Sequence, residues 1–419
     1  MSLLRRCLAG FWRRADASVG TIAALSMPVL LVAGGAATEY ASMASERGKL
    51  QAAADAAVLA GARELRFANA DLTAVINTTA RFARTQIVSQ FGTDGSDVKP
   101  AIDPARTAVE VVISRPYSAV FGLSVIPVPA QLQVRAVGKV GSGVPICLIG
   151  LEPSQAHSVW LKNRAHLTAS GCAVYSNSAH TQGLVGANYS NLSAQVICSS
   201  GGKVGAKANF TPDPITNCPQ LRDPLAARTP PHVGGCNQTN MVISGTTTTL
   251  RPGVYCGGLK ITQGAVVRLA PGEYVIKDGP LRVDGGASLS GTYVGFYLTG
   301  ATSVINFTAR STISLSAPRD GALASLLFFE DRSAPVGRRH LISSDDARML
   351  LGTIYLPNGR LRVDANKPVA DQSAYTIIVA RWMELDAGPN LVMNARYGAT
   401  DVPVPSAIGV VGTQVQLSE

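Results

Sequence analysis

The phrase LKITQG at residues 259–264 recurs along the chain and decides the fold. It returns as LRVDGG at 281–286, as LRVDA at 361–365 and as MELDAG at 383–388, at spacings of 22, 80 and 22 residues. In each copy the first and third residues are apolar and the residue between them is polar, so alternate side chains would point into a shared core. A period of about 20 residues is typical of solenoid coils. The repeat therefore predicts a right-handed parallel β-helix (a β-solenoid) in which these phrases stack in register.

Further strands extend this pattern over residues 141–400. A second phrase, PGVY at 252–255, returns as PGEY at 271–274, and we expect four coils within the interval of 80 residues. Short apolar segments supply other strands, at Ile313–Ser316, Leu326–Phe329, Gly352–Leu356 and Thr376–Val379. A β-sandwich would show similar strands but has no reason to repeat a phrase at fixed intervals.

Residues 199–240 depart from the coils. They are rich in proline, including TPDPITNCP at 211–219 and the pair Pro230–Pro231. Proline and polar residues without periodicity predict a long excursion, and we expect disulfides to pin it. Such a segment can bind a partner or cover a face or an end of the solenoid.

The cysteines indicate export to an oxidising compartment. Cys7 lies near the N-terminus, and the other six fall in one part of the chain with gaps of 18 to 26 residues. An even number favours disulfides, although six cysteines allow 15 pairings. Zinc is the alternative, but the sequence has no CxxC motif or Cys/His cluster, so we expect no metal site. We favour sequential pairs because each closes a short loop: Cys147–Cys172, Cys198–Cys218 and Cys236–Cys256.

A membrane anchor is predicted at residues 17–38, ASVGTIAALSMPVLLVAGGAAT, which contain no charged residue. As a helix these residues would span about 33 Å, close to the ~30 Å hydrocarbon thickness of a bilayer. Positive residues next to a membrane segment tend to stay in the cytoplasm, so the N-terminus should lie on the cytoplasmic side and everything after Glu39 outside. These residues are Arg5, Arg6, Arg13 and Arg14.

The same stretch has a rival interpretation as a cleavable signal peptide. We favour an uncleaved, single-pass anchor because the apolar run is long and the helical pattern continues past Glu39. Small residues four apart would allow close packing against another membrane helix. These are Gly20 with Ala24, and Ala33 with Ala37.

An α+β unit is expected next to the membrane. Alanine-rich sequence predicts that the first helix continues to about Phe67, and a second helix is expected over Asp71–Phe91. A period of two then indicates strands between residues 99 and 140. Its apolar positions are Val109, Val111, Ile113, Leu132, Val134 and Val137. We interpret the segment 116–129 as a loop or an edge segment, and the whole unit as a spacer that holds the body off the bilayer.

The N-terminal motifs resemble a known family. The chain has the basic pair Arg13-Arg14, SVGTIAAL at 18–25, Pro28, Glu39-Tyr40 and RGKLQAAADAAVLA at 47–60. Together these resemble the N-terminal membrane domain of TadG-like Flp (Tad) pilus-assembly proteins, in which the acidic residue before the tyrosine is usually Asp. The resemblance implies an inner-membrane component of a pilus or secretion apparatus, with other pilus-assembly membrane proteins as partners.

Two properties found in relatives of this domain are not expected here. Prepilin processing requires Glu at the fifth position after a glycine, but Gly20 is followed by Thr21, Ile22, Ala23, Ala24 and Leu25. Many TadG-like proteins carry a von Willebrand A domain with an Asp-x-Ser-x-Ser metal site. The exported body has no such sequence, so metal-dependent adhesion does not carry over.

A tethered carbohydrate-active enzyme is the alternative function, because parallel β-helices often host polysaccharide lyases and hydrolases. The candidate catalytic residues are His340, Asp345 and Asp346, since paired carboxylates beside a histidine suit acid–base chemistry. We favour a solvated loop there, because no second motif converges on these residues, and we expect neither enzymatic activity nor a cofactor.

Composition favours an exported, β-rich structural protein. Charged residues make up 15% of the chain and the net charge is +10. The basic residues are scattered without interleaved aromatic residues, so no nucleic-acid partner is expected. We expect a mainly β protein with an anchor and its helical extension (1–66), an α+β unit (67–140), a solenoid (141–400) and a tail (401–419). The solenoid would be periplasmic or extracellular and open to a protein, surface or polysaccharide ligand.

Overall fold

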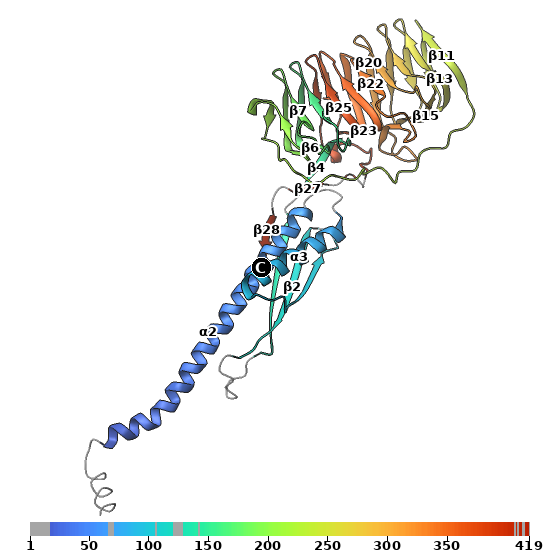
Figure 1. Ribbon diagram of the computed structural model, residues 1–419. Coiled ribbons are helices and arrows are strands. Elements are labelled where there is room, and N and C mark those ends of the chain that lie inside the picture. The colour runs from blue at the N-terminus through green and yellow to red at the C-terminus, as the bar shows by residue number, and fades with distance from the viewer. Residues whose placement is uncertain are drawn as a thin grey trace, which may run out of the picture. The chain divides into compact units, whose positions relative to one another are not determined.

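The structure is a computed structural model that describes residues 17–65, 71–104, 107–119, 129–140, 143–405, 408, 410–412 and 415–418. Cys7, the N-terminal arginines and most of the predicted loop 116–129 lie outside these residues. The chain divides into two compact units (Figure 1). The first comprises residues 1–65, 72–139 and 415–419, and the second comprises residues 66–71 and 140–414.

The first unit packs two helices on an antiparallel sheet. Helix α2 is Ala17–Leu65 and helix α3 is Leu72–Phe91, close to the predicted bounds. The sheet order is β1 (Asp97–Ile102), β2 (Ala108–Pro116), β3 (Gln131–Val140) and β28 (Val415–Ser418). Part of the predicted C-terminal tail is therefore a strand of this sheet.

The core of this unit lies between the sheet and the second half of α2. The predicted apolar positions of β2 and β3 are buried there except Val137, for which the prediction is wrong, because it lies on the other face of the sheet. Its neighbours Ala136 and Gly138 take the inward positions, and a Cβ on Gly138 would lie 2.7 Å from the Val58 carbonyl oxygen. The strand needs glycine there because the helix backbone passes so close.

The second unit is the predicted β-solenoid, built from parallel strands in three rows. The first row is formed by parts of β11 (Gln238–Ser244), β13 (Gly253–Thr262), β15 (Gly272–Lys277), β18 (Val294–Thr299), β21 (Leu326–Glu330), β23 (Asp346–Val363), β25 (Thr376–Leu385), β4 (Gly143–Gly150), β6 (His166–Ser176) and β8 (Asn191–Ser199).

The second row combines the later parts of β11, β13, β23 and β25 with β16 (Leu281–Val283), β19 (Ile305–Phe307), β22 (Arg339–Ile342), β5 (Val159–Leu161), β7 (Leu184–Gly186) and β9 (Lys203–Val204). The third row contains β12 (Thr247–Leu250), β14 (Val266–Leu269), β17 (Ser288–Gly291), β20 (Thr312–Ser316), β24 (Pro368–Val369), β26 (Asn390–Val392) and β10 (Phe210–Thr211), with parts of β23, β6 and β8.

The repeated phrases stack in register as predicted. Leu259 pairs with Leu281, and Leu361 pairs with Met383. The interval between Leu281 and Leu361 contains three coil steps rather than four, through β19 and β22. The coil between these two strands is longer because residues 317–338 add extended turns around β21.

The order of coils in space differs from the order in sequence. The chain enters at β4, builds coils to β10, and then crosses to β11 at the far end of the solenoid. The coils that follow end at β25, which pairs in parallel with β4 and β5. Entry and exit therefore adjoin, and β27 (Val410–Gly412) pairs antiparallel with β4.

The predicted excursion supplies this crossing. Residues 212–237, here called the strap, run along the solenoid to β11 (Figure 1). The side chain of Tyr355 donates a hydrogen bond to Asp223 in the strap (2.6 Å), and Arg228 donates to the carbonyl oxygens of Ala322 and Ala324 (3.0 Å each). The strap thus covers a side of the solenoid.

The three disulfides are the sequential pairs favoured from the sequence. Cys198–Cys218 fixes the first part of the strap to β8, and Cys236–Cys256 fixes its end to β13. Cys147–Cys172 joins β4 to β6.

The second repeated phrase closes a turn. The hydroxyl groups of Tyr255 and Tyr274 donate to the carbonyl oxygens of Arg251 (2.6 Å) and Ala270 (2.8 Å), four residues earlier in each case. Gly253 and Gly272 have φ angles of +156° and +136°, which favour glycine. The phrase thus forms a turn from which a strand begins.

Candidate binding site

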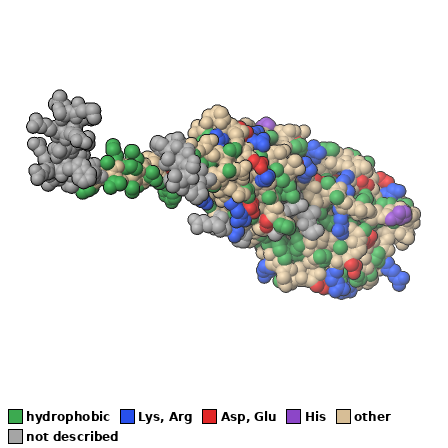
Figure 2. Space-filling view, turned by 90° about the horizontal axis from the view of Figure 1, so that it is seen from below, with side chains coloured by type: hydrophobic (Ala, Val, Ile, Leu, Met, Phe, Trp, Pro, Cys, Tyr) green, Lys and Arg blue, Asp and Glu red, His purple; other side chains and the backbone are tan. Residues whose placement is uncertain are grey.

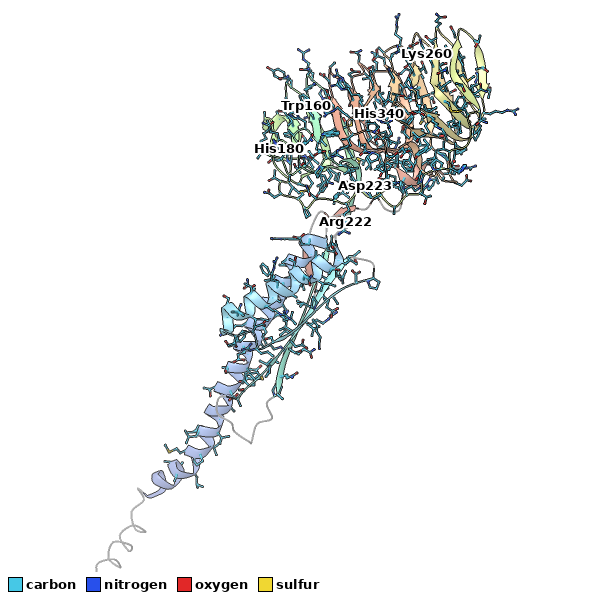
Figure 3. The ribbon with its side chains drawn as sticks, turned by 45° about the vertical axis from the view of Figure 1, so that its right-hand side comes forward. Trp160, His180, Arg222, Asp223, Lys260 and His340 are labelled. Atoms are coloured by element: carbon cyan, nitrogen blue, oxygen red, sulfur yellow. A yellow bond between two sulfur atoms is a disulfide. The ribbon has the colours of Figure 1, made fainter. Side chains whose placement is uncertain are left out.

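A groove crosses the second strand row of the solenoid. Four residues in register form its centre, because Leu341 pairs with Arg362, Arg362 with Glu384, and Glu384 with Trp160. The groove has a volume of about 750 Å³, and Figure 3 shows Trp160 and His340 on this part of the solenoid. Its lining residues are His157, Trp160, Lys162, Gly337, Arg339, His340, Leu341, Arg360, Arg362, Asp364 and Glu384.

An aromatic stack forms one wall of the groove. The His157 ring stacks on the Trp160 ring with centroids 4.3 Å apart, and the Lys162 ammonium lies 3.9 Å from the Trp160 centroid. Burial, followed by the nearby charge of Arg360, lowers the pKa of His157 below its usual value. The imidazole is therefore uncharged at neutral pH and contributes an aromatic surface rather than a cation.

Positive charge is in excess in the groove. Glu384 pairs with Lys162 (3.1 Å), Arg362 (3.4 Å) and Arg360 (3.7 Å). Lysine and arginine outnumber the lining carboxylates by four to two, and within the described part of the chain Arg339 has no carboxylate partner. The exposed Arg339 and the partly exposed Arg360 and Arg362, beside an aromatic wall, suit an anionic group on an extended ligand.

His340, a predicted catalytic candidate, lies at the floor of the groove but has no exposed surface. Its Nδ1 atom accepts a hydrogen bond from the Ile305 N–H (3.2 Å), and its Nε2 atom therefore donates to Glu330 (3.0 Å). A Cβ on Gly359 would lie 2.7 Å from the imidazole ring, so the neighbouring backbone presses against it. The imidazole is therefore held as a fully bonded group beneath the groove.

Glu330 is the centre of a buried cluster with His340 and Arg338. One carboxylate oxygen accepts bonds from Arg338 (2.9 and 3.1 Å) and His340, and the other accepts the Asn358 N–H (2.9 Å). Burial would raise the pKa of Glu330, but His340, Arg338 and Asn358 together hold it below its usual value. The ionised carboxylate therefore ties three segments of the coil together.

The other two catalytic candidates have separate partners. Asp345 accepts a hydrogen bond from the Asn366 N–H (2.6 Å), and Asp346 accepts one from the Thr312 hydroxyl (3.0 Å). Both lie where β22 leads into β23, whereas His340 points into the coil. These contacts hold turns and neighbouring coils together, and the described contacts do not join either carboxylate to His340.

Metal ligands are not grouped in the part of the chain that the structure describes: no three His, Cys, Asp or Glu side chains there are placed to hold an ion. The residues that sequence reasoning missed are Trp160, His157 and Arg360. The phrases at 361 and 383 do mark Arg362 and Glu384 as outward-facing. No pattern in the sequence indicates that residue 160 lies beside residue 384, because that contact depends on the rearranged coil order.

The segment that carries the family resemblance builds the first unit. Leu50, Ala53, Ala54, Ala57 and Val58 of α2 are fully buried against the sheet and α3. Their small side chains let the helix approach the strands closely. The motif is therefore explained by helix-on-sheet packing.

Two polar residues of this segment form hydrogen bonds with residues of the sheet or next to it. Gln51 donates to Asp55 (2.9 Å) and to the Arg135 carbonyl oxygen of β3 (3.1 Å). Glu39 is buried and accepts a hydrogen bond from the Tyr117 hydroxyl (2.7 Å). The acidic position before Tyr40 thus fixes the point at which the helix meets the rest of the unit.

The first part of α2 has the surface of a membrane segment. Among the described residues one helix, Ile22–Leu65, is long and apolar enough to cross a bilayer. Side chains such as Ile22, Leu25 and Met27 are 63% to 77% exposed, and Figure 2 shows apolar side chains gathered on this segment. Gly20, Ala24, Ala33 and Ala37 all lie in α2, and their contact with another membrane helix stays a prediction.

Comparison with known proteins agrees with these observations. Residues 17–64 match the family model described as putative Flp pilus-assembly TadE/G-like. No curated protein matches the chain, and no solved structure matches it. The chain therefore carries a TadE/G-like domain of the Flp pilus-assembly type at its N-terminus, followed by a β-solenoid.

Proposed function

We propose that this protein is a membrane-anchored structural component of a Flp (Tad) pilus or related secretion apparatus. The observation that carries the proposal is the TadE/G-like domain at residues 17–64. Its helix exposes apolar side chains in its first part and buries small ones against the sheet in its second part. One rigid helix can thus sit in a bilayer and hold the following unit at the membrane surface.

The proposed topology is a single pass through a bacterial inner membrane with a cytoplasmic N-terminus. The arginines before residue 17 support this orientation. Three disulfides in the solenoid support a periplasmic or extracellular body, because such bonds persist in oxidising compartments.

The proposed partners are other pilus-assembly membrane proteins, through α2, and a surface or polysaccharide ligand at the groove. An anionic polysaccharide would place its carboxylates or sulfates near Arg339 and Arg360. We propose no nucleic-acid partner and no cofactor.

The assembly role is tested by deleting the gene and counting assembled pili. We expect pili to be lost while the pilin subunit is still made, and the full chain to restore them. Normal piliation in the deletion strain would overturn the proposal.

The groove is tested separately by binding of the purified full chain to an anionic polysaccharide. Arg339→Ala with Arg360→Ala should weaken binding, and Arg310→Ala, an exposed arginine outside the groove, is the control. Equal loss in the control would show that only net charge matters.

We also propose that the protein is not an enzyme. The bonded, buried state of His340 and the separate partners of Asp345 and Asp346 support this. Release of new reducing ends from a polysaccharide, abolished by Asp345→Asn with Asp346→Asn, would contradict it.

A further inference from the structure

The two ends of the solenoid differ. At the β10 end the chain folds over its last coil, and Phe210 is buried there. The Ser199 N–H donates to the Ile215 carbonyl oxygen (2.8 Å), and the Ile215 N–H donates to the Ile197 carbonyl oxygen (2.9 Å). Pro212 and Pro214 follow in the same segment. At this end a proline-containing segment covers the first strand row, and the other two rows finish in β9 and β10, which have only two residues each, so this end is blunted.

The opposite end is open. In the described pairings β11 bonds only to β13, and β12 bonds only to β14. In a strand paired on one side, about half of the backbone N–H and C=O groups point away from the sheet. Figure 1 shows β11 at the edge of the solenoid.

The open coil also lacks the residues that usually protect an edge strand. Residues 238–250 read QTNMVISGTTTTL and contain no charged residue and no proline. Val242 is 61% exposed, and Met241, which faces the core, is only half-buried. Natural edge strands are commonly blocked by lysine, proline or a covering segment. An uncharged, β-branched coil with free backbone groups is therefore a pairing surface.

We infer that this open end pairs with the open end of a second copy of the chain, β11 against β11 in antiparallel register. A two-fold axis at β11 makes the edge self-complementary, because each strand offers the same donors and acceptors to the other. Met241 and Ile243 then continue the core of one solenoid into the next. This interface is independent of the proposed pilus role.

Charge and closure favour a second copy as the occupant. The chain carries a net charge of +10, so two copies repel each other over most surfaces, but the uncharged coil 238–250 allows contact there. The other end has only two-residue edge strands and a covering segment, so each chain has one long open edge and association stops at two copies. A strand of another protein in this place is the competing outcome.

The test measures the mass of the full chain in mild detergent by size-exclusion chromatography with light scattering. Wild type should be a dimer, and Val242→Lys should raise its dissociation constant by about tenfold or more, because like charges then face each other across the axis. Val204→Lys is the matched control, since Val204 is 44% exposed on the two-residue strand β9 at the blunted end. It should remain a dimer.

A photo-cross-linking residue at position 242, in cells, gives a second measurement that does not depend on the lysine variant folding. The expected product has twice the mass of the chain, and the same residue at position 204 should give none. The inference is overturned by a monomeric wild type, by a Val242→Lys protein that keeps its Cys236–Cys256 disulfide and stays dimeric, or by adducts at 242 only with a different protein.

Discussion

Replacing Glu330 by glutamine should destabilise the solenoid strongly. Glu330 is fully buried, and the side chains of Arg338 and His340 are 6% and 0% exposed. The carboxylate accepts from Arg338 and His340 on one oxygen and from the Asn358 N–H on the other. Glutamine removes the negative charge and turns an N–H₂ group toward one of these donors. Breaking a buried ion pair in this way costs roughly 3–5 kcal/mol.

This loss is measurable by equilibrium unfolding of the full chain in denaturant. Trp160 and Trp382 both lie in the solenoid, so tryptophan fluorescence reports on it. Asp371→Asn is the control, because Asp371 pairs with the half-exposed Arg348 and such a pair contributes about 1 kcal/mol or less. A Glu330→Gln protein no less stable than this control would refute the view that the cluster ties the coils together.

Three further predictions follow from the same contacts. The fold holds the pKa of Glu330 below its usual 4.5. The carboxylate therefore stabilises the fold fully above pH 4.5, and this stabilisation is lost as the pH falls through the lower folded pKa. The free energy of unfolding should thus decrease less steeply with acidification for Glu330→Gln than for wild type. Removing Cys198 and Cys218 together as serines should lower solenoid stability by about 3 kcal/mol in denaturant, since they close a loop of 20 residues, whereas Cys7→Ser should not. In the first unit, Gly61→Val should cost about 1–3 kcal/mol in thermal unfolding followed by helical circular dichroism, because an added Cβ would lie 2.0 Å from the Thr79 hydroxyl, and Gly48→Ala, which meets open space, should not be destabilising.

Much of the solenoid is readable in the sequence because its coils repeat. The apolar pairs around Lys260, Arg282 and Arg362 must point inward for each coil to bury its strand, so their register follows from the phrase itself. The disulfide pairs follow from loop length. The packing of α2 follows from its alanines. Val137 shows that apolar residues alone do not always mark the buried face of a strand, because here the small residues Ala136 and Gly138 take the buried positions.

The order of coils is not readable because it depends on contacts distant in sequence. Parallel pairing of β25 with β4 joins residues more than two hundred positions apart, and no local pattern distinguishes this from a continuous stack. The groove depends on that pairing, since Trp160 meets Glu384 only across it. The role of His340 is not readable either, because a buried histidine and a catalytic one look alike in sequence and its partners Glu330 and Ile305 lie on other strands.

The central claim is that an N-terminal helix lodged in the inner membrane holds the solenoid outside the cytoplasm. Protease added to intact spheroplasts, followed by immunoblotting for the solenoid, tests this most directly. The account predicts that the solenoid epitope leaves the membrane fraction while a cytoplasmic marker survives. A solenoid that stays protected until the membrane is broken would contradict it.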